Sequence, residues 1–255
     1  KRQVFKSIED QNNWFAASDK PKLVDYLDPE LDTNSYQGVS SDFNLGNVNH
    51  AGRIDTLKLV EAYRNYLKEN ELIQFQSFQY NKIEFEGETI KYNAIIADKI
   101  VFCEGFGLKQ NPFFNYLPLN EVKGELITIH APDLDIKFLL KSSLFLLPLG
   151  NNNYKVGATF NWTDKTSNPS EEGRIELEEK LQKIINVPYK VISQSAGIRP
   201  TVAGRRPLVG VHPNNPKLNV LNGLGTRGVM IAPTVAKQLF NHLENEMELD
   251  EEINI

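Results

Sequence analysis

Regularly spaced glycines form the most suggestive motif of this 255-residue sequence. The segment Asn222-Gly223-Leu224-Gly225-Thr226-Arg227-Gly228 follows an apolar run, precedes an amphipathic one and fits G-x-G-x-x-G. Glycine lets the backbone approach a ligand closely, and free N–H groups at a helix start attract negative charge. A first dinucleotide fingerprint should be followed by a complete βαβ unit, whereas one helical pattern follows here. Three interpretations stay open: an ADP-binding fingerprint, a simple chain reversal, and a helix start directed at another part of a cofactor.

Arginines on a backbone stiffened by glycine and proline form the second motif. Ala196-Gly197-Ile198-Arg199-Pro200 is followed by Gly204-Arg205-Arg206-Pro207-Leu208-Val209-Gly210. A guanidinium held in this way can bind a carboxylate through two parallel hydrogen bonds. The alternative is that these arginines form surface or structural salt bridges, and composition by itself favours that alternative.

The sequence carries no other catalytic signature. The four histidines are scattered without the spacing of metal ligands, and neither a G-x-S-x-G elbow nor a Walker loop occurs. We therefore predict no metal site and name no catalytic side chain. Cys103 is the single cysteine, which excludes an internal disulfide, and its place in an apolar run predicts an inert, buried thiol.

Composition predicts a globular protein without special partners. Apolar residues make up 40% of the chain and charged residues 24%, which is ordinary for a globular fold. The net charge of −5 makes nucleic acid an unexpected partner. No apolar run reaches the roughly 20 residues of a membrane helix, so we expect a cytoplasmic protein with no membrane partner.

Periodicity predicts three helices. Asp55 is a suitable N-cap for a helix with Leu57, Val60, Tyr63 and Leu67 on one face. The second helix carries Leu177, Leu181, Ile184 and Ile185, and the last carries Val235, Leu239 and Leu243. The acidic tail over 244–252 is expected to be a solvated end.

Strand patterns change along the chain. Segments 72–80 and 82–85 are predicted to be strands around Asn81, and 100–103 a buried parallel strand ending at Glu104-Gly105-Phe106-Gly107. Segments 123–129, 143–149 and 154–160 predict an antiparallel sheet, and 218–221 a further strand. The expected fold class is α/β with an α+β insertion. Residues 51–107 and 196–255 form one predicted domain, and 1–50 and 108–195 form an antiparallel-sheet domain inserted in it.

Taken together, these segments resemble the D-amino-acid oxidase superfamily, and most closely its glycine oxidase and sarcosine oxidase-like branch of FAD-dependent oxidoreductases. The resemblance rests on the segments already quoted and on their order: Gly52-Arg53-Ile54-Asp55-Thr56, Ile100 to Gly107, Val122-Lys123-Gly124-Glu125-Leu126, Leu147-Pro148, Val156-Gly157-Ala158-Thr159, Ala196 to Pro200, and Gly223 to Pro233. It implies that 51–107 and 196–255 are the remnant of a Rossmann-like FAD-binding domain, and that the inserted domain binds substrate.

The activity that this resemblance implies is oxidation of the C–N bond of an amino acid or a secondary amine, with hydride passing to the flavin of FAD. It implies that Arg199 pairs with the substrate carboxylate and that Phe145 and Phe160 contact the substrate. It also implies that the cofactor is bound by the following residues: Gly105, Gly107, Gly223, Gly225, Thr226, Arg227, Gly228 and Val229.

Three departures from the family pattern qualify these expectations. The family's first G-x-G-x-x-G does not occur near Lys1, so we expect a shortened chain that is inactive by itself and binds FAD weakly or not at all. Phe145 stands where glycine oxidases have a tyrosine, and Glu104 stands where small residues are usual, next to the expected diphosphate. Two alternatives stay open: oxidation of a tRNA-linked amine within the same superfamily, and a binding module without chemistry of its own.

Overall fold

The computed structural model describes residues 1–33 and 36–255, which divide into two compact units. Unit 1 comprises Lys1–Arg53 and Lys123–Gly197, and unit 2 comprises Ile54–Val122 and Ile198–Ile255. Each unit thus consists of two separated segments of the chain. The sequence predicted domain boundaries after residues 50, 107 and 195, and the FAD-binding and substrate-binding roles assigned to those domains stay predictions.

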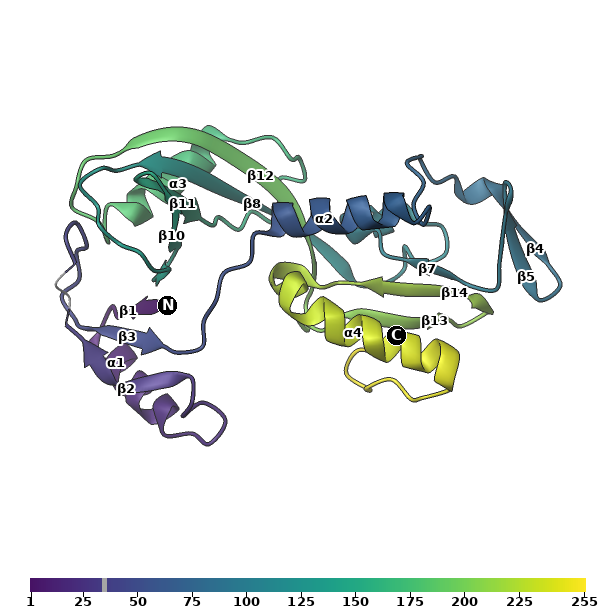
Figure 1. Cartoon of the computed structure of the whole chain (residues 1–255), viewed down its shortest axis with the longest axis horizontal. Coiled ribbons are helices and arrows are strands. Elements are labelled where there is room, and N and C mark those ends of the chain that lie inside the picture. The colour runs from purple at the N-terminus through teal and green to yellow at the C-terminus, as the bar shows by residue number, and fades with distance from the viewer. Residues whose placement is uncertain (34–35) are drawn as a thin grey trace. The chain divides into compact units, whose positions relative to one another are not determined.

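A sheet of eight strands, in the order β12-β8-β11-β10-β9-β1-β3-β2, is built mainly from unit 1 (Figure 1). Its neighbours pair antiparallel wherever register is defined, except for the parallel pair β1–β9. The strands are β1 (Arg2–Val4), β2 (Leu27–Asp32), β3 (Leu45–Val48), β8 (Leu119–His130), β9 (Leu140–Lys141), β10 (Phe145–Gly150), β11 (Asn153–Gly157) and β12 (Lys190–Val202). The antiparallel sheet predicted from the middle of the chain is therefore confirmed.

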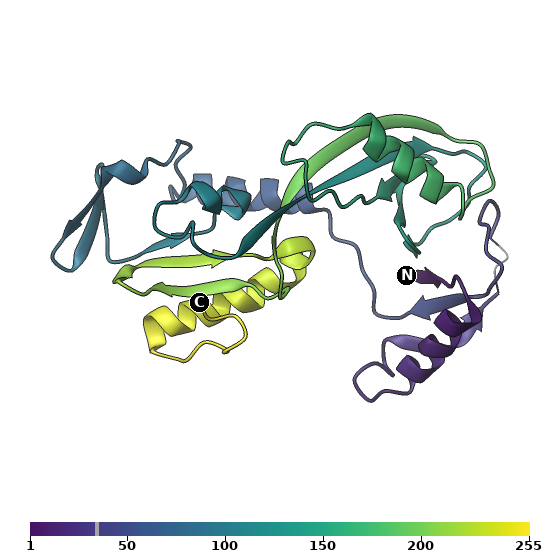
Figure 2. The same ribbon diagram turned by 180° about the vertical axis from the view of Figure 1, so that it is seen from behind.

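Helix α3 (Glu171–Leu181) lies across one face of this sheet, as Figure 2 shows in green. Ser170 caps the helix by accepting a hydrogen bond from the Gly173 N–H. Leu177 and Leu181 are buried in a core that they share with strand residues such as Ile127. This predicted helix is confirmed, although Ile184 and Ile185 follow its last turn.

The N-terminal segment adds helix α1 (Ile8–Ser18) against β2 and β3. The indole N–H of Trp14 donates to the Asp28 carbonyl at 2.8 Å, and its ring meets Phe5 edge-on at 5.6 Å between centroids. A Cβ at Gly46 would lie within 2.8 Å of both rings. Glycine is therefore required where β3 passes beneath this aromatic pair.

Unit 2 contains a three-stranded sheet in the order β13-β14-β7. Strands β13 (Leu208–His212) and β14 (Asn215–Asn222) pair antiparallel, whereas β14 and β7 (Ile100–Phe102) pair parallel. Helix α4 (Gly228–Asn245) packs on this sheet through Val235 and Leu239, together with Val209. The strand predicted at 218–221 and the last predicted helix are confirmed.

The chain end is anchored to unit 2, so the prediction of a solvated tail is wrong for part of this segment. Leu249 and Ile253 are buried beside α4. The Val209 N–H donates to the Ile253 carbonyl at 2.9 Å, and Gln238 donates to Asp250 at 2.8 Å. Isolated apolar residues hold the tail in place, although most of its acidic side chains face solvent.

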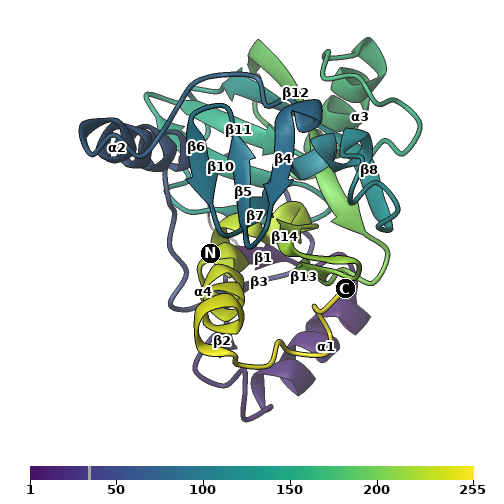
Figure 3. The ribbon, with the colours of Figure 1, turned by 90° about the vertical axis from the view of Figure 1, so that its right-hand side faces the viewer.

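A separate antiparallel meander of three strands follows α2, and Figure 3 shows β4, β5 and β6 side by side. These strands are β4 (Ile83–Glu86), β5 (Thr89–Tyr92) and β6 (Ile95–Ala97), and the short helix η1 (Tyr80–Lys82) precedes them. The strand predicted at 82–85 is confirmed. The strand predicted at 72–80 is wrong, because most of this segment is irregular and ends in η1.

Helix α2 (Thr56–Glu69) begins where predicted, because the Asp55 carboxylate accepts a hydrogen bond from the Lys58 N–H at 3.2 Å. Its apolar face is not covered by any described residue. Leu57 is 68% exposed and Tyr63 is 61% exposed, and no side chain of α2 is buried. Periodicity predicted the helix correctly but did not predict what covers it.

Strand β7 shows a similar difference between pattern and burial. It is parallel to β14, as predicted, but it forms an edge of its sheet, and Val101 is 40% exposed. The strand is therefore buried only on the face of Phe102, which is 4% exposed. The prediction of an inert core thiol is wrong, because Cys103 lies just beyond the strand and is exposed. The mixed α/β fold class with an antiparallel-rich sheet is confirmed.

Candidate functional site

Two glycine loops meet in unit 2 because the strands before them are parallel neighbours. One loop follows β7 and includes Gly105 and Gly107, and it continues as the short helix η2 (Gly105–Gln110). The other follows β14 and runs from Gly223 into the short helix η3 (Gly225–Arg227) and then α4. Parallel strands end at the same edge of a sheet, where α/β folds bind their ligands.

Asn222 joins the two loops. Its Nδ2 donates to the Gly105 carbonyl at 3.0 Å, and its Oδ1 accepts from the Gly223 N–H at 2.8 Å. The side chain is only 3% exposed. No role was predicted for Asn222, although it opens the glycine motif. Asparagine directly before glycine at a strand end is a turn signal, and that signal could have identified it.

The glycines of these loops serve different purposes. Gly223 has a φ of +69°, and an added Cβ would lie 2.7 Å from Val202 Cγ2, so backbone shape and packing both require glycine there. Gly105 and Gly225 have φ values of +59° and +57°. A Cβ at Gly105 would meet nothing within 4 Å, and one at Gly225 would meet only Thr201, at 3.8 Å. These two positions leave space for a ligand to approach the backbone.

The start of α4 is suited to a negative charge. Arg227 is the N-cap residue and makes no side-chain capping bond, although the first N–H groups of a helix need partners from outside it. The helix has 18 residues and no acidic residue in its first turn. Thr226, Arg227 and Val229 are exposed at this point, and the Arg227 guanidinium donates to the Arg205 carbonyl at 3.2 Å.

Glu104 is held within unit 2 by two neighbours. Tyr80 donates its hydroxyl to one carboxylate oxygen, and Asn111 donates to the other at 2.7 Å. Burial, together with this carboxylate, raises the pKa of Tyr80 to about 12. These bonds fix the direction of the Glu104 carboxylate, which keeps its negative charge because both donors are neutral.

Arg199 lies on β12, next to the second glycine loop. The glycine- and proline-containing stretch around it is a strand as far as Val202. Alternate residues of a strand share a face, so Arg199 lies on the same face as Thr201, whose methyl group approaches Gly225. The guanidinium is half-buried, and burial lowers the pKa of Arg199 from its usual value. In contrast, Arg206 is exposed and pairs with Glu252 at 2.8 Å, as the surface salt-bridge alternative predicted.

Phe145 lines a cavity of about 660 Å³ in unit 1. Phe145 on β10 pairs with Gly157 on β11. A Cβ at Gly157 would lie 3.1 Å from the Phe145 ring, so glycine lets this ring lie over the neighbouring strand. Arg53 lines the same cavity and donates to the Pro148 carbonyl at 2.9 Å. Burial and nearby lysines lower the pKa of Lys141, another residue of the cavity wall. The cavity therefore combines apolar and cationic surfaces, which suits a substrate with an acid group.

Phe160 is 58% exposed on the segment that follows β11. The backbones of Asn161 and Lys123 exchange two hydrogen bonds of 2.9 Å. The Lys123 ammonium is 1% exposed and contacts Asp164 at 2.5 Å and Glu125 at 3.4 Å. Its hydrogen bond to Asp164 raises the pKa of Lys123 and lowers that of Asp164 to about 2. This ion cluster was not predicted from the sequence, and it fixes the segment that carries Phe160.

The structure thus places the predicted residues in two groups. Unit 2 holds all the predicted cofactor residues and Arg199, whereas unit 1 holds Phe145 and Phe160. Within residues 1–33 and 36–255, no three His, Cys, Asp or Glu side chains are arranged to hold a metal ion. No helix in the described part of the chain is long and apolar enough to cross a membrane.

Comparisons with known proteins agree with this geometry. The family model described as FAD dependent oxidoreductase (DAO) matches residues 5–241. The glycine oxidase of Bacillus subtilis (strain 168) is 24% identical over 204 residues, which cover 73% of this chain and 55% of that protein. The tRNA 5-methylaminomethyl-2-thiouridine biosynthesis bifunctional protein MnmC of Idiomarina loihiensis is 28% identical over 139 residues, which cover 52% of this chain and 23% of that protein.

A solved structure shows the same fold. The crystal structure of glycine oxidase from Geobacillus kaustophilus superposes with a TM-score of 0.77 at 15% identity, covering 97% of this chain and 71% of that chain. The chain spans 23% of the MnmC relative and 55% of the glycine oxidase relative. The fold expected from the resemblance is confirmed, and the activity of a whole protein stays a proposal.

Proposed function

The chain belongs to the FAD dependent oxidoreductase family, and from that membership we propose that it serves the oxidation of the C–N bond of an amino acid or a secondary amine. The observation that supports this most is the pair of glycine loops joined by Asn222, beside an α4 N-terminus without a side-chain cap. Such a site can hold an extended anionic cofactor against backbone N–H groups.

The residues of this site fit FAD. Gly105 and Gly225 present open backbone where any side chain would project into the space. Together with Gly107, Gly223 and the segment 226–229, they would hold the cofactor. FAD, when bound, supplies the acceptor for the hydride of the substrate. The start of α4 would stabilise negative charge at its end of the cofactor through the helix dipole.

The substrate side of the proposal rests on three residues. Arg199 would hold the acid group with its planar guanidinium, because its strand face leads to the glycine loop. Phe145 and Phe160 would contact the apolar part of the substrate. Phe145 has no hydroxyl group, so it would contribute shape and exclude water without donating a hydrogen bond.

We further propose that the 255 residues by themselves bind FAD weakly and are inactive. No first G-x-G-x-x-G loop lies near the start of this sequence, and such a loop supplies much of the affinity for a dinucleotide. The open edge of β7 and the uncovered face of α2 are where an additional polypeptide could complete the cofactor site. Tight binding of FAD to residues 1–255 in a calorimetric titration would contradict this.

A panel of amines tests the activity. The full-length protein is purified and scanned for flavin absorbance, then supplied with glycine, sarcosine, proline and D-amino acids while peroxide and flavin bleaching are recorded. Bleaching under anaerobic conditions identifies a substrate whichever electron acceptor is used. Flavin that no amine in the panel reduces would contradict oxidation of a free amino acid.

The second candidate is oxidation of an amine attached to tRNA, which the similarity to MnmC proteins favours. In that case nucleic acid would be a partner, contrary to the expectation from net charge. Anaerobic flavin bleaching by tRNA that carries a secondary amine, but not by the free amines, would support it. Equal bleaching by unmodified tRNA would argue against it.

A further inference from the structure

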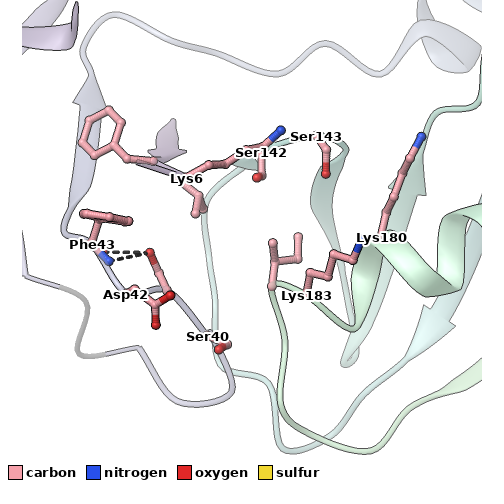
Figure 4. Close-up of a pocket in the computed structure, with 12 residues that line it drawn as sticks. Lys6, Ser40, Asp42, Phe43, Ser142, Ser143, Lys180 and Lys183 are labelled. Carbon is pink, nitrogen blue, oxygen red and sulfur yellow. Dashed lines mark hydrogen bonds between the residues drawn. The ribbon is translucent and has the colours of Figure 1, made fainter. Parts of the chain in front are cut away.

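A second cavity, separate from the one at Phe145, lies in unit 1 and has a volume of about 410 Å³. Its walls come from four separate segments: the end of β1, the loop at 40–43, the turn at 142–143 and the end of α3 (Figure 4). The floor is apolar, since Val4, Phe5 and Ile184 are 4–5% exposed. None of its residues belongs to the candidate flavin or substrate site.

Three lysines line this cavity: Lys6, Lys180 and Lys183. Lys180 is paired with Glu176. The ammonium groups of Lys6 and Lys183 have no hydrogen bond or ion pair within the described chain. Lysines near the end of a helix can interact with its dipole, which could account for Lys180 and Lys183. Lys6 lies on a different segment, and the helix does not account for it.

Hydroxyl groups complete a set of donors around the cavity. Ser40, Ser142 and Ser143 are among its lining residues, and Figure 4 shows the hydroxyls of Ser142 and Ser143 on the same side as Lys6. The Ser40 N–H donates to the Ile184 carbonyl at 2.9 Å, which ties the loop to the end of α3. The hydroxyl of Ser41 bonds to the backbone of Phe43 and shapes the loop. These bonds fix the wall of the cavity that the loop at 40–43 forms.

The only acidic side chain of the lining is Asp42. It forms no salt bridge with the three lysines in the described structure, so it does not neutralise them. Because Lys180 is already paired with Glu176, Lys6 and Lys183 against Asp42 leave the cavity with one excess positive charge, although the whole chain carries −5. This local reversal of charge indicates an anionic ligand.

We propose that this cavity binds a small phosphomonoester. Lysine ammonium groups and serine hydroxyls from separate segments line the cavity, and such donors suit a tetrahedral dianion, whereas arginine is preferred for planar carboxylates. A volume of about 410 Å³ exceeds that of phosphate itself and falls in the range of small-molecule sites. The organic part of the ester lies on the floor of Val4, Phe5 and Ile184.

Calorimetry with phenyl phosphate and the full-length protein tests this proposal, because the phenyl ring matches the apolar floor. We expect saturable binding that is tighter than that of inorganic phosphate at the same ionic strength. Lys6→Gln and Lys183→Gln each weaken it about tenfold, the effect of losing one charge-assisted contact. Lys22→Gln, an exposed lysine outside the cavity, leaves the affinity unchanged, and circular dichroism verifies that each variant is folded.

Several outcomes would overturn the proposal. No saturable binding by the unmodified protein would exclude the site, and equal losses in all three variants would show a non-specific charge effect. A 5′-phosphorylated RNA tetramer distinguishes the source of the phosphate, since tighter binding of the tetramer than of phenyl phosphate would point to a nucleic-acid end and reject a small ester. The measurement does not involve flavin, so its result is independent of the proposed oxidation.

Discussion

Arg199 provides the sharpest test of the substrate site. Its guanidinium is half-buried on β12. Thr201, the next residue on the same face of this strand, approaches Gly225. A hydrogen bond to a charged group contributes about 1.5–3 kcal/mol. Each 1.4 kcal/mol corresponds to a tenfold change in affinity, so Arg199→Ala should raise KM about 10- to 150-fold if this arginine holds the substrate carboxylate.

The assay separates binding from cofactor retention. Steady-state kinetics of the full-length protein gives KM and kcat for the amine substrate, and the ratio of visible to ultraviolet absorbance gives flavin content. We expect KM to rise while flavin content stays normal. Arg199→Lys should recover only part of the loss, because an ammonium group cannot form two parallel hydrogen bonds. Arg206→Ala is the matched control, since Arg206 forms an exposed ion pair with Glu252 and such pairs contribute little.

Three results would refute the reasoning. An unchanged KM in Arg199→Ala would show that the arginine is structural. An equal loss for a substrate analogue that has no carboxylate would show that Arg199 acts on the shape of the site and not on the acid group. A fall in flavin content would assign the residue to the cofactor instead.

Three further predictions concern the elements that support the sites. Asn222→Ala breaks the bond between the glycine loops, and we expect it to cost about 1–3 kcal/mol of unfolding free energy and to lower flavin content; unchanged flavin content would show that the loops are held by other contacts. Gly223→Ala should lower the melting temperature more than Gly87→Ala, because both glycines have positive φ but only Gly223 lacks space for a Cβ; equal losses would mean that Val202 moves aside. Asp164 has its pKa lowered to about 2 by Lys123, so its stabilising effect is present above its unfolded pKa of about 3.9 and is lost as pH falls towards 2. Asp164→Asn should therefore reduce the dependence of melting temperature on pH between these values, and an unchanged dependence would contradict this role.

Local signals in the sequence were sufficient to predict helices α2, α3 and α4, whereas α1 (Ile8–Ser18) was not predicted. Asp55 begins α2 as an N-cap, and the apolar spacing of α3 and α4 predicts which side chains reach the core. These features depend on residues within a few positions of one another. The polar turn between β10 and β11 is another local feature, since Asn151 and Asn152 adopt positive φ there.

Features that depend on distant residues could not be predicted in this way. Asn222 acquires its role from Gly105, which lies 117 residues earlier in the sequence. The buried ammonium of Lys123 is stabilised by Asp164, 41 residues later. The cavity with three lysines joins four segments, so no window of the sequence contains its charge. In each case the residue types are unremarkable until the fold brings them together.

Strand β7 and helix α2 show where pattern and environment separate. Both have the apolar sequences of covered elements, yet Val101 and Leu57 face solvent. Apolar periodicity indicates the face of an element that is suited to packing. It does so even where no described residue packs against that face. A parallel edge strand beside a glycine loop is also where an α/β sheet is extended and where its ligand binds. The edge of β7 and the exposed face of α2 are therefore the two surfaces of unit 2 on which the weak binding of FAD proposed for these 255 residues depends.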